Sequence, residues 1–118
     1  MRLLIAGVPR SGKTTLAGEG AGHTDDYIDL GWGEASLSVS YLFDAVGPWT
    51  IEGVAIPRAL RKWLVQNPTG KPADKVIFLN EPFGELSKGQ LSMAKGCRTV
   101  WLQVVDELRE RGVEIEER

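Results

Sequence analysis

Short apolar runs recur along the chain, and polar or glycine-containing segments separate them. Runs of roughly four to eight residues that contain β-branched or aromatic side chains are typical of strands, and continuous apolar runs of that length indicate buried ones. The run at Trp49–Val54 is only moderately apolar, because the polar residues Thr50 and Glu52 interrupt it. We predict strands at Leu3–Ala6, Asp26–Leu30, Trp49–Val54, Lys75–Leu79 and Val113–Ile115.

Longer segments with apolar residues at helical spacing lie between several of these runs. The longest is Leu91–Arg111, and Gly112 is a natural stop for it. Another helix is predicted from Pro57 to about Asn67, because proline suits the first helical turn and Pro68 follows the end. The stripes that should face a core are Ala94, Cys97, Trp101, Val104, Val105 and Leu108 on the first helix, and Leu60, Trp63 and Leu64 on the second.

The segment Glu34–Val46 allows two interpretations. Its part Leu37–Tyr41 alternates between apolar and polar residues as a strand does. The whole segment also has one apolar helical face, and its length favours a helix that Gly47-Pro48 ends. The residues on that face are Ala35, Val39, Leu42, Phe43 and Val46.

The alternation of strands and helices predicts an α/β fold for residues 1–118 as one domain. A parallel sheet of five strands, covered by helices on both faces, is the expected arrangement. Ligands of such sheets bind at the carboxyl ends of the strands. Asp29, Glu52 and Asn80 lie at or near predicted strand ends, so we expect them to converge on one crevice with the residues that follow the first strand.

Directly after the first strand the chain carries the pattern G-x-x-x-x-G-K-T. This is the phosphate-binding P-loop motif, in the strand–loop–helix context that it requires. Backbone N–H groups of such a loop form a concave nest for phosphate oxygens, and its glycines permit the necessary backbone angles. The predicted nucleotide-binding residues are Gly7, Val8, Pro9, Arg10, Ser11, Gly12, Lys13, Thr14 and Thr15.

Within this loop three side chains have distinct expected roles. Lys13 is predicted to reach the β- and γ-phosphates as a catalytic cation, and the Thr14 hydroxyl to ligate Mg²⁺. Thr15 should lie near the α-phosphate. The helix after the loop should be short or frayed, because Gly18, Gly20 and Gly22 follow it closely.

Two acids are candidates for the chemistry beside the loop. Glu52 is the predicted second metal-side carboxylate, which would hold Mg²⁺ through its water shell or orient an attacking hydroxyl. Asp29 could accept the proton of an acceptor hydroxyl, and the choice between Asp29 and Glu52 as the base stays open. Phosphoryl transfer also needs a cation on the transferred group, and Arg98 is our candidate among Arg58, Arg61, Lys62, Lys88, Lys95 and Arg98.

Composition narrows the class of protein. With 118 residues, 25% charged residues and a net charge of −2, the chain suits a small globular protein without general attraction to nucleic acid or anionic membranes. The single cysteine, Cys97, cannot form an internal disulfide and is expected to be buried. These features and the absence of a membrane-length apolar run predict a cytoplasmic protein. His23 is expected to be an exposed loop residue.

The chain resembles small P-loop kinases of the nucleoside and nucleotide kinase group, to which adenylate kinases belong. Three features carry the likeness. The first is the loop Gly7–Thr15, and the second is Ile51–Arg58, in which an acid and a glycine at the strand end precede a Pro-Arg pair. The third is the basic segment Lys88–Arg98 after the fourth strand. Two extra residues separate Gly53 from Pro57, and the chain is far shorter than a typical nucleotide kinase. It is also similar to virus-encoded minimal P-loop proteins, some of which phosphorylate modified bases in DNA.

The resemblance implies transfer of the γ-phosphate of ATP, with Mg²⁺, to a small-molecule, nucleoside, nucleotide or modified-base hydroxyl. The alternative is a nucleotide-binding regulator or an assembly ATPase that has no phosphoryl acceptor. An N-K-x-D guanine-reading motif is absent, which disfavours a small GTPase. Nothing in the pattern chooses between ATP and GTP, and a homodimer that covers one sheet face is a further expectation.

Overall fold

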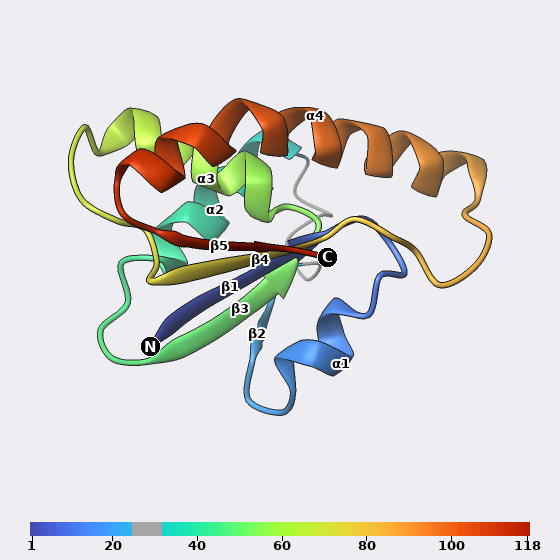
Figure 1. Cartoon of the computed structure of the whole chain (residues 1–118), viewed down its shortest axis with the longest axis horizontal. Helices are drawn as coiled ribbons and strands as arrows, with labels where there is room; N and C mark the ends of the chain where they lie inside the picture. The colour runs from blue at the N-terminus through green and yellow to red at the C-terminus, as the bar shows by residue number, and fades with distance from the viewer. Residues whose placement is uncertain (25–31) are drawn as a thin grey trace.

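The computed structural model describes residues 1–24 and 32–118 and contains one parallel sheet with helices around it (Figure 1). The strands are β1 (Arg2–Gly7), β2 (Gly22–His23), β3 (Trp49–Gly53), β4 (Lys75–Leu79) and β5 (Glu114–Glu117). The helices are α1 (Lys13–Ala17), α2 (Trp32–Leu42), α3 (Ile56–Gln66) and α4 (Lys88–Glu110). No helix in these two described ranges combines the length and the apolar character needed to cross a membrane.

All five strands of the sheet are parallel, in the order β2-β3-β1-β4-β5. The predicted α/β class and five-stranded parallel sheet are therefore confirmed. β1 lies in the centre, with Ile5 opposite Glu52 of β3 on one side and Gly7 opposite Leu79 of β4 on the other. The carboxyl ends of these three strands thus meet at one edge of the sheet, where the glycine-containing loop leaves β1.

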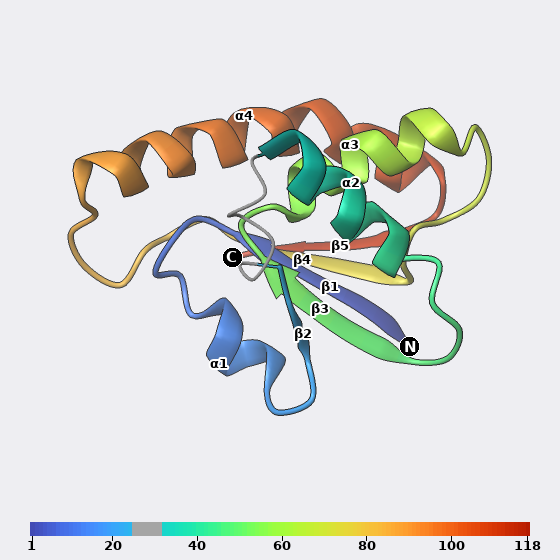
Figure 2. The same cartoon turned by 180° about the vertical axis from the view of Figure 1, so that it is seen from behind.

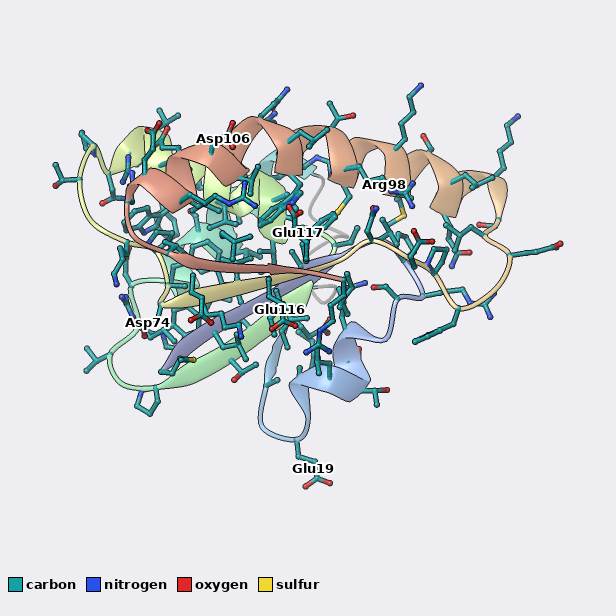
Figure 3. All side chains as sticks on the ribbon, viewed as in Figure 1. Glu19, Asp74, Arg98, Asp106, Glu116 and Glu117 are labelled. Carbon is teal, nitrogen blue, oxygen red and sulfur yellow. The ribbon has the colours of Figure 1, made fainter. Side chains whose placement is uncertain are left out.

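Helices lie on both faces of the sheet, but very unequally. Of the helices in the described residues, α2, α3 and α4 cover one face in Figures 1 and 2, whereas α1 lies on the other. α1 has five residues, in agreement with the short helix that the glycine run predicts. The thinly covered face carries a polar cluster in place of a second full core: Lys75 Nζ lies 3.0 Å from both Glu114 Oε2 and Glu116 Oε1 (Figure 3).

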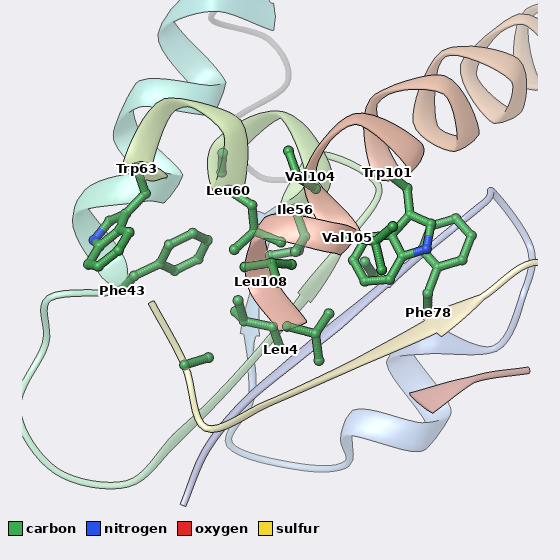
Figure 4. Close-up of a cluster of buried hydrophobic side chains, with 14 of the residues drawn as sticks. Leu4, Phe43, Ile56, Leu60, Trp63, Phe78, Trp101, Val104, Val105 and Leu108 are labelled. Atoms are coloured by element: carbon green, nitrogen blue, oxygen red, sulfur yellow. The ribbon is translucent and has the colours of Figure 1, made fainter. Parts of the chain in front are cut away.

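The main core fills the space between the sheet and the three larger helices (Figure 4). The predicted apolar stripes of α3 and α4 are buried in full. Trp101 stacks on Phe78 of β4 with ring centroids 4.7 Å apart, and its indole N–H donates to Glu117 Oε1 at 2.9 Å. Cys97 is buried, as predicted. These contacts hold α4 against β4 and β5, so the end of α4 that extends past the sheet has a rigid base.

Several predicted boundaries differ from the structure. α2 begins earlier than expected and ends at Leu42, so Val46 follows the helix and is fully exposed, contrary to its predicted core position. α4 begins at Lys88 because Ser87 and Gln90 form a reciprocal capping box at its start. The strand predicted at Asp26–Leu30 lies entirely outside the described residues, and the described strand beside β3 is Gly22–His23.

β2 packs against β3 through a position that tolerates no side chain. A Cβ on Gly53 would lie 1.6 Å from the Thr24 hydroxyl oxygen, and the φ angle of Gly53 is 154°. Thr24 is itself fully buried. The glycine therefore allows the residues that follow β2 to approach the end of β3.

We predict that Gly53→Ala destabilises the protein by about 1–3 kcal/mol, because it overpacks a buried contact. Gly89→Ala is the matched control: Gly89 lies in α4 with no atom near its Cβ position, and the change should be neutral or stabilising by up to about 1 kcal/mol. Urea unfolding of both variants measures this. Equal stability of Gly53→Ala and the parent chain would contradict the packing described.

Candidate functional site

A close backbone contact and two positive φ angles fix the conformation of the loop between β1 and α1. A Cβ on Gly7 would lie 2.6 Å from the carbonyl oxygen of Leu79, and the amide of Val8 donates to that same oxygen at 3.1 Å. Arg10 and Gly12 both have positive φ angles, 59° and 88°. Successive residues of alternating backbone hand turn their N–H groups toward one side, which is the geometry of an anion-binding nest. Glycine at positions 7 and 12 is required by this conformation.

A second loop, residues 80–87, holds the tip of the first. The amide of Phe83 donates to the carbonyl of Arg10 at 2.7 Å, and Arg10 Nη1 donates to the carbonyl of Glu85 at 2.8 Å. These bonds explain why Arg10, a residue with a side chain, sits in the left-handed region. The bond from Nη1 also directs the Arg10 side chain toward residues 80–87.

Lys13 is buried within its own loop. Its ammonium group donates to the carbonyl of Val8 at 2.7 Å and to the Ser11 hydroxyl at 3.4 Å. The side chain is 7% exposed although it carries a charge. A buried ammonium group needs acceptors around it, and the loop carbonyl supplies one. The cation is therefore fixed at the centre of the loop.

Glu52 is the predicted carboxylate that the structure brings to the loop. It lies at the end of β3 and is 1% exposed. The Thr14 hydroxyl donates to Oε1 at 3.3 Å, and Nδ1 of His23 lies 2.7 Å from the same oxygen. The second oxygen, Oε2, is buried and has no hydrogen-bond partner among the described residues. A buried carboxylate oxygen without a partner is costly, so it marks a place where a ligand could supply one.

These groups line a cavity of about 300 Å³. Seven loop residues from Pro9 to Thr15 form one side, and Glu52 with Val54 forms another. Gln90 and Met93 of α4 form the third, because the N-terminal turns of α4 extend beyond the strand ends in Figure 1. The structure thus joins the predicted loop residues, including Lys13 and Thr14, with Glu52 in a single crevice.

A second cavity, of about 400 Å³, lies on the other side of the loop. It shares Ser11, Gly12 and Thr15 with the first. Its remaining walls are mainly apolar and come from Leu16, Leu79 and Phe83, with Glu81 and Arg118 at the rim. Phe83 is 75% exposed, and a Cβ on Gly12 would lie 2.7 Å from its ring. An exposed aromatic ring therefore lies directly beside the glycine loop.

Arg98 does not line either of these cavities. It projects from α4 and binds Asn80, with Nε donating to the side-chain oxygen at 2.7 Å and Nη2 to the backbone carbonyl at 2.9 Å (Figure 3). Asn80 thereby fixes this arginine at a neighbouring cavity lined by Phe78, Trp101 and Leu102. Asp29, the alternative base, lies outside the described residues.

Two basic or nucleophilic side chains lie between α3 and α4. Burial lowers the pKa of the Arg58 guanidinium, which packs where Gly96 leaves room for it. Burial also raises the pKa of the Cys97 thiol to about 11, against the opposing effect of Lys13 and other nearby cations. Cys97 is therefore a neutral thiol near pH 7 and not a nucleophile.

Several residues that line the two cavities were not predicted from the sequence, among them Phe83, Gln90 and Met93. Gln90 had a readable signal, since Ser87 and Gln90 match the capping-box pattern that begins a helix. Phe83 and Met93 carry no local signal, because only the tertiary arrangement brings them to the loop. His23 was expected in an exposed loop, but it belongs to β2, is half-buried and contacts Glu52.

The donor set around Glu52 suits a magnesium ion that is bound together with a phosphate ligand. Thr14 Oγ1 and the carboxylate are oxygen donors within 3.3 Å of each other. Within residues 1–24 and 32–118 no group of three or more His, Cys, Asp or Glu side chains is placed to hold a metal by itself. Mg²⁺ usually keeps several waters and takes its other ligands from one or two protein groups and substrate phosphates.

Comparison of the chain with protein-family models gives no match, and neither does comparison with curated proteins.

Proposed function

We propose that the chain has a P-loop NTPase fold, binds Mg²⁺ and ATP at the loop after β1, and transfers the γ-phosphate to the hydroxyl of a small acceptor. The acceptor class is a nucleoside, a nucleotide, another small molecule or a modified DNA base. One observation carries the proposal: the buried carboxylate of Glu52, of which one oxygen is unpaired among the residues that the structure describes, lines the same cavity as the loop, Lys13 and Thr14.

The loop supplies what a triphosphate needs. Its backbone N–H groups provide neutral donors at fixed positions, and the Lys13 ammonium provides a charge. Lys13 would exchange its bond to the Val8 carbonyl for phosphate oxygens, which are stronger, charged acceptors. α1 is too short to contribute much of a helix dipole, so the loop amides and Lys13 carry most of the binding.

Thr14 and Glu52 would hold the metal. The Thr14 hydroxyl is exposed to the cavity, and Glu52 Oε2 has no partner within residues 1–24 and 32–118, so each has a lone pair for Mg²⁺ or for its water ligands. The ion would supply positive charge that offsets the negative charge developing on the phosphates.

The acceptor would enter beside Val54, Gln90 and Met93, at the end of the cavity away from the shared loop residues. These walls hold no cation, so they suit a neutral hydroxyl compound better than a free phosphate. Transfer joins the acceptor oxygen to the γ-phosphorus and releases ADP, and the hydroxyl proton passes to a carboxylate. Asp29 and Glu52 remain the two candidates for that base.

The apolar cavity beside Phe83 would hold the base of the nucleotide. It meets the phosphate cavity at Ser11, Gly12 and Thr15, so a nucleotide whose α-phosphate lies near Thr15 would extend into it. An aromatic ring is the usual partner for the flat face of a base. This orientation directs the γ-phosphate toward Glu52 and the base toward β4 and β5.

The first test is transfer from γ-labelled ATP and Mg²⁺ to nucleosides, nucleoside monophosphates, small sugars, and DNA with ordinary or hydroxymethylated bases. Lys13→Ala should lower the transfer rate by roughly 10²–10³-fold, because a preorganised cation on the phosphates is lost. Glu52→Gln should lower it comparably while leaving the variant able to bind ATP. Lys71→Ala removes an exposed lysine at the opposite end of the sheet and should leave the rate unchanged.

Label that appears in one acceptor with the parent chain and disappears with Lys13→Ala supports a kinase. Label that appears only as inorganic phosphate would contradict acceptor transfer and favour the assembly ATPase. Tight ATP binding without release of label would favour the nucleotide-dependent regulator.

The position of the base is tested with Phe83 variants. Phe83→Ala should weaken ATP binding by roughly 5–100-fold, the loss expected for one base–aromatic stack, whereas Phe83→Tyr should retain it. Inorganic triphosphate is the matched ligand: its affinity should be the same for the parent chain and both variants. Isothermal titration calorimetry measures all of these affinities.

An equal loss of inorganic triphosphate and ATP binding in Phe83→Ala would show that the ring supports the loop and does not contact the base. Unchanged ATP binding would place the base elsewhere.

A further inference from the structure

His23 contacts the carboxylate around which the proposed metal site is built. It is the second and last residue of β2 and lies opposite Glu52 in the register of β2 with β3. Its Nδ1 is 2.7 Å from Glu52 Oε1. The His23 side chain is 40% exposed, whereas that of Glu52 is 2% exposed. β2 therefore brings to the buried acid a side chain that also reaches solvent.

This pairing is fixed by the packing of the strand ends. The residue after His23 is the buried Thr24, and its hydroxyl occupies the space where Gly53 has no side chain. A shift of β2 by one residue would remove this fit and would also turn His23 to the other face of the sheet. Contact between His23 and Glu52 is thus a consequence of the fold. It does not rely on a free side-chain rotation.

The contact determines which carboxylate oxygen is available. When Glu52 is ionised its carboxylate only accepts hydrogen bonds, and His23 then donates through a protonated Nδ1. The Thr14 hydroxyl donates to the same oxygen, Oε1, at 3.3 Å. Oε2 is left buried and unpaired among the described residues. Two donors on one oxygen orient the carboxylate plane and leave the lone pairs of the other oxygen for a ligand.

We propose that His23 is a positioning residue for the metal site: its Nδ1–H holds the Glu52 carboxylate so that Oε2 faces Mg²⁺ or its water shell. This assignment rests on the proposed function. Thr14 alone is the weaker restraint on the carboxylate, because its hydroxyl donates to Oε1 at 3.3 Å, against 2.7 Å for His23 Nδ1, and its oxygen also has to ligate the ion.

The test compares three substitutions that differ in where they place a donor. The side-chain amide of His23→Asn lies near the position of Nδ1, and the longer His23→Gln places its amide near Nε2 instead. His23→Leu has no donor. Binding of a non-hydrolysable ATP analogue to the full chain is measured by calorimetry with EDTA and over a range of Mg²⁺ concentrations. The half-saturating Mg²⁺ concentration is the readout.

Loss of a group that orients a metal ligand typically weakens metal binding by 10–100-fold. His23→Leu and His23→Gln should therefore raise the half-saturating Mg²⁺ concentration by about 10-fold or more, and His23→Asn should stay within about 3-fold of the parent chain. Binding of the analogue in EDTA should be the same in all four proteins. Should His23→Leu fail to fold, the comparison of His23→Asn with His23→Gln decides the question by itself.

Three results would overturn the assignment while leaving nucleotide binding intact. The first is an unchanged half-saturating Mg²⁺ concentration in both His23→Leu and His23→Gln. The second is a rise of that concentration in His23→Asn as large as in the other two variants. The third is a fall in analogue affinity that is as large in EDTA as in Mg²⁺. If the parent chain does not bind the analogue at all, the proposed function fails, and the role of His23 fails with it.

Discussion

A Cβ on Gly7 would lie 2.6 Å from the Leu79 carbonyl oxygen, and this close approach fixes the direction in which the chain leaves β1. Because Gly7 has no side chain, the amide of Val8 can donate to that carbonyl. The loop that follows then turns back over the strand ends, with Lys13 folded into it. The two cavities share residues of this loop, and the position of Glu52 matters only because the loop lies beside it. The candidate site therefore depends on one backbone contact between two neighbouring strands.

The helix on the far side of the sheet from the core, α1, has only five residues and supplies one wall of each cavity. Most of the residues that complete the cavity walls come after β4 in the chain. Residues 80–87 bind the tip of the loop between β1 and α1, and the first turns of α4 line the same cavity as Glu52. Both are anchored to the sheet side of the molecule, α4 by the buried stacking of Trp101 on Phe78 and residues 80–87 by the exposed binding of Arg98 to Asn80. α4 thus supplies one wall, Gln90 and Met93, of the cavity that Glu52 lines.

The sequence predicted those parts of the fold that local pattern encodes. The strand at Lys75–Leu79 and the buried stripe of α4 follow from continuous apolar runs and helical periodicity, and both predictions are confirmed. β2 could not be predicted, because Gly22–His23 has no apolar pattern. It forms through backbone pairing with β3, and Gly53, which has no side chain, leaves room for Thr24 after it. The same reasoning applies to the site. The loop and Glu52 were readable from motif and strand-end position, whereas His23 and Phe83 reach the site only through contacts with residues distant in sequence. Arg98 was selected by charge alone, and charge does not encode its bond to Asn80.

The central claim, that the loop after β1 is a triphosphate site completed by Glu52, is tested most directly by a crystal structure with Mg²⁺ and a non-hydrolysable ATP analogue. The account predicts that the β- and γ-phosphates accept bonds from the amides of residues 10–14, and that Lys13 Nζ moves from the Val8 carbonyl to phosphate oxygens. It also predicts Mg²⁺ on Thr14 Oγ1, with Glu52 Oε2 bound to the ion or to one of its waters. Phosphates bound away from the loop, with Lys13 still on Val8, would contradict the account.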